Sequence, residues 1–427
     1  DLVRSRGLGD VYKRQVLEAK YKLGLFSDPY KYCDTLRVEK ELYTTAHRAV
    51  AREIAAETFV LLKNEDHLLP LERKGKIALI GPMADARNNM CGMWSMTCTP
   101  SCHGTLLEGI RSAAGDKAEI LYARGSNIYH DAELEKGGAG IRPLERGNEL
   151  QLLDEALHTA ARADVIVAAL GECAEMSGES ASRTELGIPD AQQDLLKALV
   201  KTGKPVVLLL FTGRPLVLNW EDANVHSILN VWFGGSETGD AIADVLFGKV
   251  TPGGKLTTTF PRSVGQLPLY YNHLNTGRPD PDSHSFNRYS SNYLDMSNEP
   301  LYPFGYGLSY TNFSYGNLQL SSDVLSRNGE LTVSVTVTND GDFDGYEIVQ
   351  MYLHDIYAEI SRPVKELKGF ERIFLKKGES REVKFVITED DLRFYNSGLQ
   401  YVYEPGEFDV MVGANSRDVQ TERFRAD

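Results

Sequence analysis

The sequence predicts an α/β sandwich domain with a mostly parallel sheet, followed by an all-β sandwich of the fibronectin type III or immunoglobulin-like kind. In the middle of the chain, short apolar runs alternate with amphipathic helical stretches, which is typical of βαβ units. Near the end, β-branched and polar residues alternate in short runs separated by turn signals. That second pattern is typical of antiparallel strands with one buried face.

The predicted α/β domain rests on five apolar runs, expected as buried strands at 77–80, 120–123, 165–170, 206–211 and 228–232. Between the third and fourth runs, apolar residues recur at helical spacing over 191–200. Strand, helix and strand in this rhythm indicate a sheet covered on both faces, with right-handed crossovers. Ahead of it, 45–64 is interpreted as a long helix running into the segment VLLKN.

The predicted β-sandwich begins near Glu330. Its expected strands are LTVSVTVTN (331–339), EIVQMYLHD (347–355), REVKFVI (381–387) and EFDVMVG (407–413). Turn signals at 339–341 and 377–379 separate them. Between the two domains, the region after Gly248 is rich in Pro, Gly and Tyr without periodicity, which predicts a long ordered loop or a covering strap.

Composition excludes several classes of protein. The 427 residues carry a net charge of -14, which argues against nucleic acid or an anionic membrane as the main partner. No run approaches the roughly 18 apolar residues of a membrane-spanning helix. A zinc site at Cys98, Cys102 and His103 lacks a second ligand pair, so the five cysteines are interpreted as adventitious thiols and no metal is expected. No G-x-G-x-x-G or Walker motif follows a predicted strand, and no cofactor is expected.

Glu179 is the strongest candidate for chemistry. It follows the apolar run 165–170, and open α/β sheets bind ligands beyond the carboxyl ends of their strands. The surrounding glycine and serines suit a loop that could close on a substrate. Glu172, Glu175 and Glu185 compete for the same role, and a solvated acidic loop residue is the alternative interpretation.

Several ordered segments resemble glycoside hydrolase family 3 β-glucosidases of the bacterial periplasmic type. The most specific are AREIAAETFVLLKN (51–64), MSGESASRTELGIPDAQ (176–192), TGRPLVLNW (212–220), YPFGYGLSYTNF (302–313) and SRPVKELKGFE (361–371). The resemblance covers residue 16 to the end. It implies a family architecture of an amino-terminal (β/α)8 barrel, a second α/β domain and a fibronectin-like domain, of which only the last two would be present.

The domain boundaries are expected as follows: 1–15 a probable non-native leader, 16–44 the end of the barrel and a linker, 45–262 the family's carboxy-terminal α/β domain, 263–325 a long connecting loop region, and 326–427 the fibronectin type III-like domain. Residues 1–15 are polar and Arg-rich, resemble translated vector sequence, and lack the apolar core of a signal peptide. The chain is therefore expected to be truncated.

The resemblance implies a retaining mechanism with two carboxylates. The family's nucleophile is a barrel aspartate in a segment resembling Ser-Asp-Trp, and this tripeptide does not occur here. The family's Gly-Glu-x-x-(Asp or Ser)-Arg segment maps onto Gly178, Glu179, Ser182 and Arg183, which makes Glu179 the expected general acid/base. Trp94 is expected near the sugar, where an aromatic face suits a pyranose, although a packed core tryptophan is nearly as plausible. Arg183 is expected at the substrate site, as a loop anchor or ion-pair partner rather than a catalytic group.

The implied activity is hydrolysis of terminal non-reducing β-D-glucosyl residues from gluco-oligosaccharides or aryl glucosides, in a periplasmic or secreted protein that could form a homodimer. Without the barrel, the chain is expected to be inactive alone. The segment 266–279, with Tyr270, Tyr271, His273 and Arg278, is expected at an interdomain or dimer contact. The alternatives are a non-catalytic carbohydrate-binding or assembly fragment and a structural fragment without independent function.

Overall fold

The structure, a computed structural model, describes residues 13–95, 99, 103–135, 145–279 and 287–427. The chain divides into two compact units, Asp1–Val50 and Ala51–Asp427. Within the first unit, residues 13–22 are helical and are followed by α2 (Arg37–Glu41). Helix α3 (Thr45–Thr58) leads into the second unit, which contains both predicted domains. None of the helices in the described part of the chain has the length and apolar character needed to cross a bilayer.

The first domain is built on one sheet whose strands, within the described residues, are β1 (Val60–Asn64), β2 (Lys76–Ile80), β3 (Glu119–Ala123), β4 (Val165–Gly171), β5 (Val206–Phe211) and β6 (Ser227–Asn230). Their order is β1-β6-β5-β4-β2-β3. All neighbours are parallel except β1 and β6. The five predicted strands and the mostly parallel sheet are thus confirmed.

The segment 45–64 differs from the prediction in one respect. Helix α3 ends at Thr58, and VLLKN is the strand β1. Val60 and Leu61 pair with β6 at the sheet edge, and both are fully buried. Backbone pairing in the sheet and burial therefore override a helical continuation that local sequence alone would allow.

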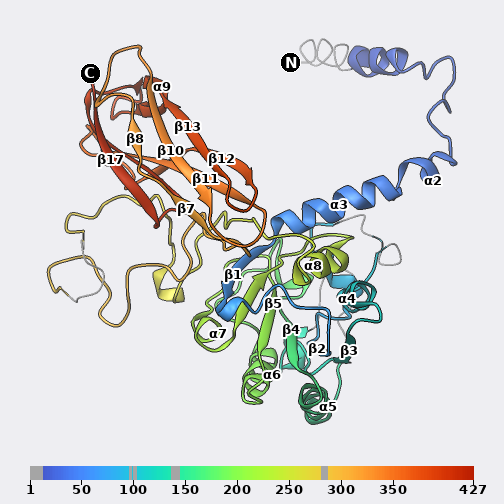
Figure 1. The fold of residues 1–427 in the computed structure, drawn as a ribbon. Helices are drawn as coiled ribbons and strands as arrows, with labels where there is room; N and C mark the ends of the chain where they lie inside the picture. The colour runs from blue at the N-terminus through green and yellow to red at the C-terminus, as the bar shows by residue number, and fades with distance from the viewer. Residues whose placement is uncertain (1–12, 96–98, 100–102, 136–144, 280–286) are drawn as a thin grey trace. The chain divides into compact units, whose positions relative to one another are not determined.

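Helices cover both faces of the sheet (Figure 1). They are α4 (Leu106–Ala114), α5 (Glu149–Ala161), α6 (Asp190–Val200), α7 (Asn219–Asn224) and α8 (Thr238–Leu246). Side chains of α3, α4 and α8 share one apolar core, whereas those of α5 and α6 share another. The strands divide their residues between these cores: Val207 and Leu209 of β5 face the first, and Leu208 and Leu210 face the second. A strand buried on both faces has to be apolar throughout, which explains the unbroken runs in the sequence.

The second domain is a sandwich of two mainly antiparallel sheets. One contains β13-β10-β7 with β8 paired to β10, and the other has the order β12-β11-β16-β17-β9. The strands are β7 (Phe313–Tyr315), β8 (Gln319–Leu320), β9 (Val324–Leu325), β10 (Leu331–Asn339), β11 (Gly345–Asp355), β12 (Glu366–Leu375), β13 (Ser380–Ile387), β16 (Gly406–Gly413) and β17 (Val419–Ala426). The short helix α9 (Glu389–Leu392) and the hairpin of β14 (Phe394–Tyr395) and β15 (Tyr401–Val402) complete it. Inward-facing residues of both sheets form one core, as predicted.

A buried ion pair connects the sandwich to the chain between Gly248 and β7, here called the loop region. The Lys255 ammonium lies 3.0 Å from the Glu347 carboxylate, and both side chains are almost fully buried. Tyr315 donates a hydrogen bond of 2.8 Å to the same carboxylate. Gln350 donates to the backbone oxygen of Gly305. The loop region is therefore fixed to the sandwich by specific polar contacts.

His130 links helices α5 and α6 through two carboxylates, and this contact generates a pH-dependent stability. Its Nδ1 lies 3.0 Å from Glu149 and its Nε2 lies 3.2 Å from Asp194. Partial burial lowers the pKa of His130, but the hydrogen bonds with Asp194 and Glu149 and the charges of Glu149 and Asp190 outweigh it, so the pKa is raised above 6.5. The stabilisation is fully present below the unfolded pKa and is lost as the pH rises through the higher folded pKa.

We predict that His130→Asn removes this pH dependence. In urea unfolding, the wild-type chain should exceed the variant in unfolding free energy by about 0.5 kcal/mol near pH 6 and by less near pH 9, a small effect because the pair is partly exposed. His158→Asn is the matched control, since His158 lies exposed on α5 beside Asp154. Equal pH dependence in both variants would contradict the assignment to His130.

Candidate active site at the edge of the sheet

The order of the strands places a switch point between β2 and β4. From β2 the chain proceeds to β3 on one side, and from β4 it proceeds to β5 and β6 on the other. The connecting helices leave in opposite directions from such a switch point, so the loops after the two strands diverge and leave room for a ligand. The loop after β2 carries Trp94, and the loop after β4 carries Glu179. The structure thus brings two of the predicted site residues to one edge.

Close backbone contacts hold these two loops together. The Asn89 side chain accepts a hydrogen bond of 2.9 Å from the backbone N–H of Ala174. Gly178 has φ +102°, and a Cβ added there would lie 3.0 Å from Met93 Cγ and 3.3 Å from Trp94 Nε1. A larger residue would be strained and would push the Trp94 loop away. Glycine at 178 therefore allows the tryptophan to lie beside the loop of Glu179.

Glu179 lies at an exposed turn of this loop. Gly178 precedes it, and Ser180, with φ +59°, follows it. Among the described residues, its carboxylate has no hydrogen-bond or ion-pair partner. An exposed carboxylate at a turn is accessible to a ligand.

That cluster is centred on Glu172, which directly follows β4 and is completely buried. One carboxylate oxygen accepts a hydrogen bond of 2.8 Å from Arg183 and lies 3.0 Å from Arg214 Nε. The other accepts from the Thr212 hydroxyl at 2.9 Å and from the Gly213 backbone N–H at 3.1 Å. A buried carboxylate needs such compensation, because its desolvation costs several kcal/mol.

Arg214 connects Glu172 to the backbone at both ends of the Glu179 turn. Its Nη2 donates to the backbone oxygens of Met176 and of Ala181, the latter at 2.8 Å. Residues 177–180 are therefore held at their two ends, while the Glu179 carboxylate between them has no partner among the described residues. Such an arrangement keeps a side chain in position and leaves its polar atoms available.

Arg183 is largely buried, and its guanidinium contacts Glu172 and the backbone oxygen of Gly187, the latter at 3.0 Å. These contacts make it an anchor of the loop, and contact with substrate stays a prediction. Trp94 is 70% exposed, so its side chain is available to a ligand rather than packed in a core. The importance of Glu172 was missed by sequence reasoning, although its place directly after a buried strand was a usable signal.

The interpretation of the five cysteines as adventitious thiols is wrong for Cys91. Cys91 is disulfide-bonded, whereas Cys33 and Cys173 are free. Burial raises the pKa of the Cys173 thiol to about 11, so it stays protonated and unreactive. Cys98 and Cys102, for which a zinc site was considered and not expected, lie outside the described residues. Within the residues that are described, no group of three His, Cys, Asp or Glu side chains is arranged to hold a metal ion.

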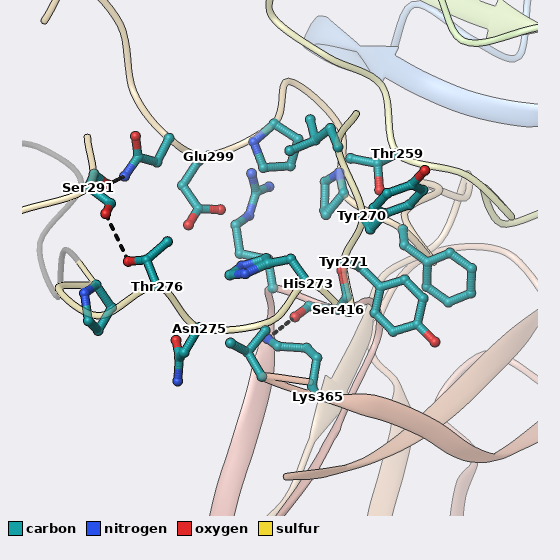
Figure 2. A pocket seen from close by; sticks show the side chains of 18 residues that line it. Thr259, Tyr270, Tyr271, His273, Asn275, Thr276, Ser291, Glu299, Lys365 and Ser416 are labelled. Carbon is teal, nitrogen blue, oxygen red and sulfur yellow. Dashed lines mark hydrogen bonds between the residues drawn. The ribbon is translucent and has the colours of Figure 1, made fainter. Parts of the chain in front are cut away.

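A pocket lies away from this edge, between the loop region and the sandwich. It has a volume of about 460 Å³ and is lined by residues of 259–304 together with Val364, Lys365, Ser416 and Arg417 (Figure 2). Tyr270, Tyr271 and His273, expected at an interdomain or dimer contact, line it. Tyr271 stacks on Phe304 with ring centroids 4.2 Å apart. The segment thus meets the sandwich domain, and a dimer contact stays a prediction.

Comparison with known proteins defines the class of this fold. Residues 59–310 match the glycosyl hydrolase family 3 C-terminal domain, and residues 347–416 match the fibronectin type III-like domain. The chain belongs to glycoside hydrolase family 3. The resemblance expected from the sequence is confirmed, and so is the succession of an α/β domain by a fibronectin-like domain.

Relatives with described activities support the same class. The chain is 47% identical over 421 residues to a periplasmic β-glucosidase of Salmonella typhimurium, covering 96% of this chain and 54% of the relative. It is 40% identical to a β-xylosidase of Formosa agariphila, covering 94% and 53%. A solved β-glucosidase of Listeria innocua in complex with gluconolactone superposes with a TM-score of 0.84 at 38% identity, covering 96% and 53%. The chain spans about half the length of these relatives.

We predict that Glu172→Gln destabilises the chain by about 3 kcal/mol, because it leaves two largely buried guanidinium groups without their counter-ion. Urea unfolding of both chains measures the difference. Glu185→Gln is the matched control in the same loop, since Glu185 is exposed, and it should change stability by less than about 0.5 kcal/mol. Similar values for the two variants would show that Glu172 does not anchor the loop.

Proposed function

We propose that this chain supplies the general acid/base, Glu179, of a retaining β-glucosidase whose nucleophile belongs to a part of the protein outside these residues. The observation that carries the proposal is the clamped loop. Arg214, which lies against the buried Glu172, holds its two ends, while the Glu179 carboxylate has no partner among the described residues at a sheet edge where such folds bind ligands. The family membership supports glycoside hydrolysis as the reaction.

The proposed mechanism has two proton transfers at Glu179. In the first step, its carboxylic acid protonates the glycosidic oxygen while a nucleophilic carboxylate about 5 Å away attacks the anomeric carbon. In the second step, the Glu179 carboxylate removes a proton from water, which hydrolyses the glycosyl-enzyme intermediate. A general acid must keep its proton, which requires shielding from water or a nearby negative charge. Because Glu179 is exposed here, that environment would come from the surface on which its loop closes and from the substrate.

Trp94 supplies an aromatic surface beside the loop that carries Glu179. Its exposed indole is suited to contact the C–H face of a sugar, so it would bind substrate rather than transfer protons. Arg183 would act mainly by holding the loop through Glu172. The proposed substrates are β-linked gluco-oligosaccharides or aryl β-glucosides with terminal non-reducing glucose. The names of the Salmonella and Listeria relatives support glucosides, while the Formosa relative is a β-xylosidase.

A periplasmic or secreted location is part of the proposal. The Salmonella relative is named a periplasmic β-glucosidase. The disulfide at Cys91 also favours an oxidising compartment, because cytosolic thiols are kept reduced.

The chain by itself should hydrolyse essentially no nitrophenyl β-glucoside, because the attacking carboxylate is missing. Nitrophenol release by purified chain measures this against buffer. Turnover that Glu179→Gln abolishes would mean that this chain contains its own nucleophile, and the proposed division of roles would be wrong.

In a polypeptide that joins this chain to the barrel, Glu179→Gly should slow hydrolysis of methyl β-glucoside or cellobiose by at least about 10²-fold. Bond cleavage in an activated dinitrophenyl glucoside should be slowed far less, because that leaving group departs without a proton. Pre-steady-state and steady-state rates for the two substrate types give the comparison.

Glu185→Gln in the same polypeptide is the control and should leave both rates near those of the parent enzyme. An equal loss on both substrate types for Glu179→Gly would move the acid/base role to another residue.

A further inference from the structure

The pocket between the loop region and the sandwich, here called the loop pocket, is lined by segments that hydrogen bonds hold in place. The backbone N–H of Val364 donates to the oxygen of His273 at 2.9 Å, and Leu274 and Pro363 form an antiparallel bridge. On the far side, Arg262 Nε donates to the backbone oxygen of Glu299 at 3.1 Å. The pocket is therefore preformed rather than a gap between loose loops. Its volume of about 460 Å³ lies in the range of small-molecule sites.

Polar atoms without partners among the described residues converge on this pocket. Figure 2 shows the Glu299 carboxylate and the His273 ring pointing toward one another. Within the described part of the chain, the Glu299 carboxylate has no hydrogen-bond or ion-pair partner, although its residue is partly buried. His273 Nδ1 lies 3.0 Å from the backbone oxygen of Leu274 and donates to it, which leaves Nε2 as an acceptor.

Lys365 adds unused donors to the same pocket. Its ammonium donates to the backbone oxygen of Ser416 at 2.6 Å, the single bond described for its three N–H groups. Burial lowers its pKa, and the charge of Glu299 partly offsets this effect. A half-buried ammonium with spare donors and a partly buried carboxylate with spare acceptors are both costly unless water or a ligand satisfies them.

Aromatic surface accompanies these polar groups. Tyr270 is 62% exposed at the pocket, and Tyr271 is stacked on Phe304. The pocket thus combines apolar faces with donors and acceptors of both charges.

The presence of both charges beside aromatic faces favours some classes of ligand over others. A simple anion would meet the Glu299 carboxylate, and a simple cation would meet Lys365 and Arg417. A purely apolar ligand would leave Glu299 and Lys365 unsatisfied. A neutral polyol ring satisfies both, because each hydroxyl donates and accepts while the C–H face packs on an aromatic ring.

We propose that the loop pocket is a carbohydrate-binding site for a neutral hexose unit, separate from the Glu179 edge. None of its lining residues belongs to the loop of Glu179 or to that of Trp94. Glu299 accepts from sugar hydroxyls, Lys365 donates to them, His273 accepts through Nε2, and Tyr270 contacts the ring face. The site does not depend on the proposed function, since it needs no catalytic partner.

The test is binding of cellobiose and methyl β-D-glucopyranoside to the full chain, measured by saturation-transfer NMR and calorimetry. We expect a Kd in the millimolar range. Glu299→Ala and His273→Ala should each weaken binding by at least about 5-fold, and Tyr270→Ala should do so comparably. Circular dichroism and the urea midpoint verify folding, and the exposed positions of His273 and Tyr270 make these two variants safe for the fold.

Two variants serve as controls. Tyr401→Ala and Tyr395→Ala each remove a comparably exposed tyrosine from the sandwich, and both should bind sugar as the parent chain does. Absence of sugar binding in the folded parent chain would overturn the proposal, and so would binding that survives Glu299→Ala with His273→Ala. Tighter binding of glycine or inorganic phosphate, displacing the sugar, would assign the pocket to a zwitterion or an anion instead. Loss of sugar binding in Trp94→Ala alone would place the sugar at the Glu179 edge.

Discussion

The buried carboxylate of Glu172 is the interaction on which the candidate site depends. It lies at the end of β4, where a strand buried on both faces emerges from the sheet. A charge in that position is tolerated only with close counter-charges and hydrogen-bond donors. Arg183, Arg214 and the Thr212–Gly213 turn supply them, and each also fixes a piece of loop. Satisfying one desolvated group thus defines the path of the chain around Glu179.

Two carboxylates of one loop differ in their surroundings. The buried residue, Glu172, is fully bonded, whereas Glu179 a few positions later is exposed and unpaired among the described residues. Arg214 joins the two by binding the backbone on both sides of the turn. The same separation occurs at the loop pocket, where backbone hydrogen bonds hold the walls and side chains such as Glu299 keep their polar atoms available.

Much of the fold was predictable because the burial of a strand determines its pattern of apolar and polar residues. Strands such as β5 are apolar throughout since helices cover both faces, and β10 alternates since one face is solvated. Strands β12 and β17 were not predicted, because their fully buried residues are confined to the last three positions of each strand. The strand β1 was interpreted as the continuation of a helix, since only its pairing with β6 distinguishes the two conformations.

The sequence by itself determined the class of the two domains, the family and the candidacy of Glu179, because periodicity and short motifs are local properties of the chain. Tertiary structure alone decided that Trp94 lies beside Gly178, that Arg183 faces Glu172, and that Lys365 and Glu299 line one pocket. The two members of each pair are separated along the chain, so local sequence does not reveal their contact. Which polar atoms are satisfied and which remain free depends on desolvation, and this is known only once the chain is folded.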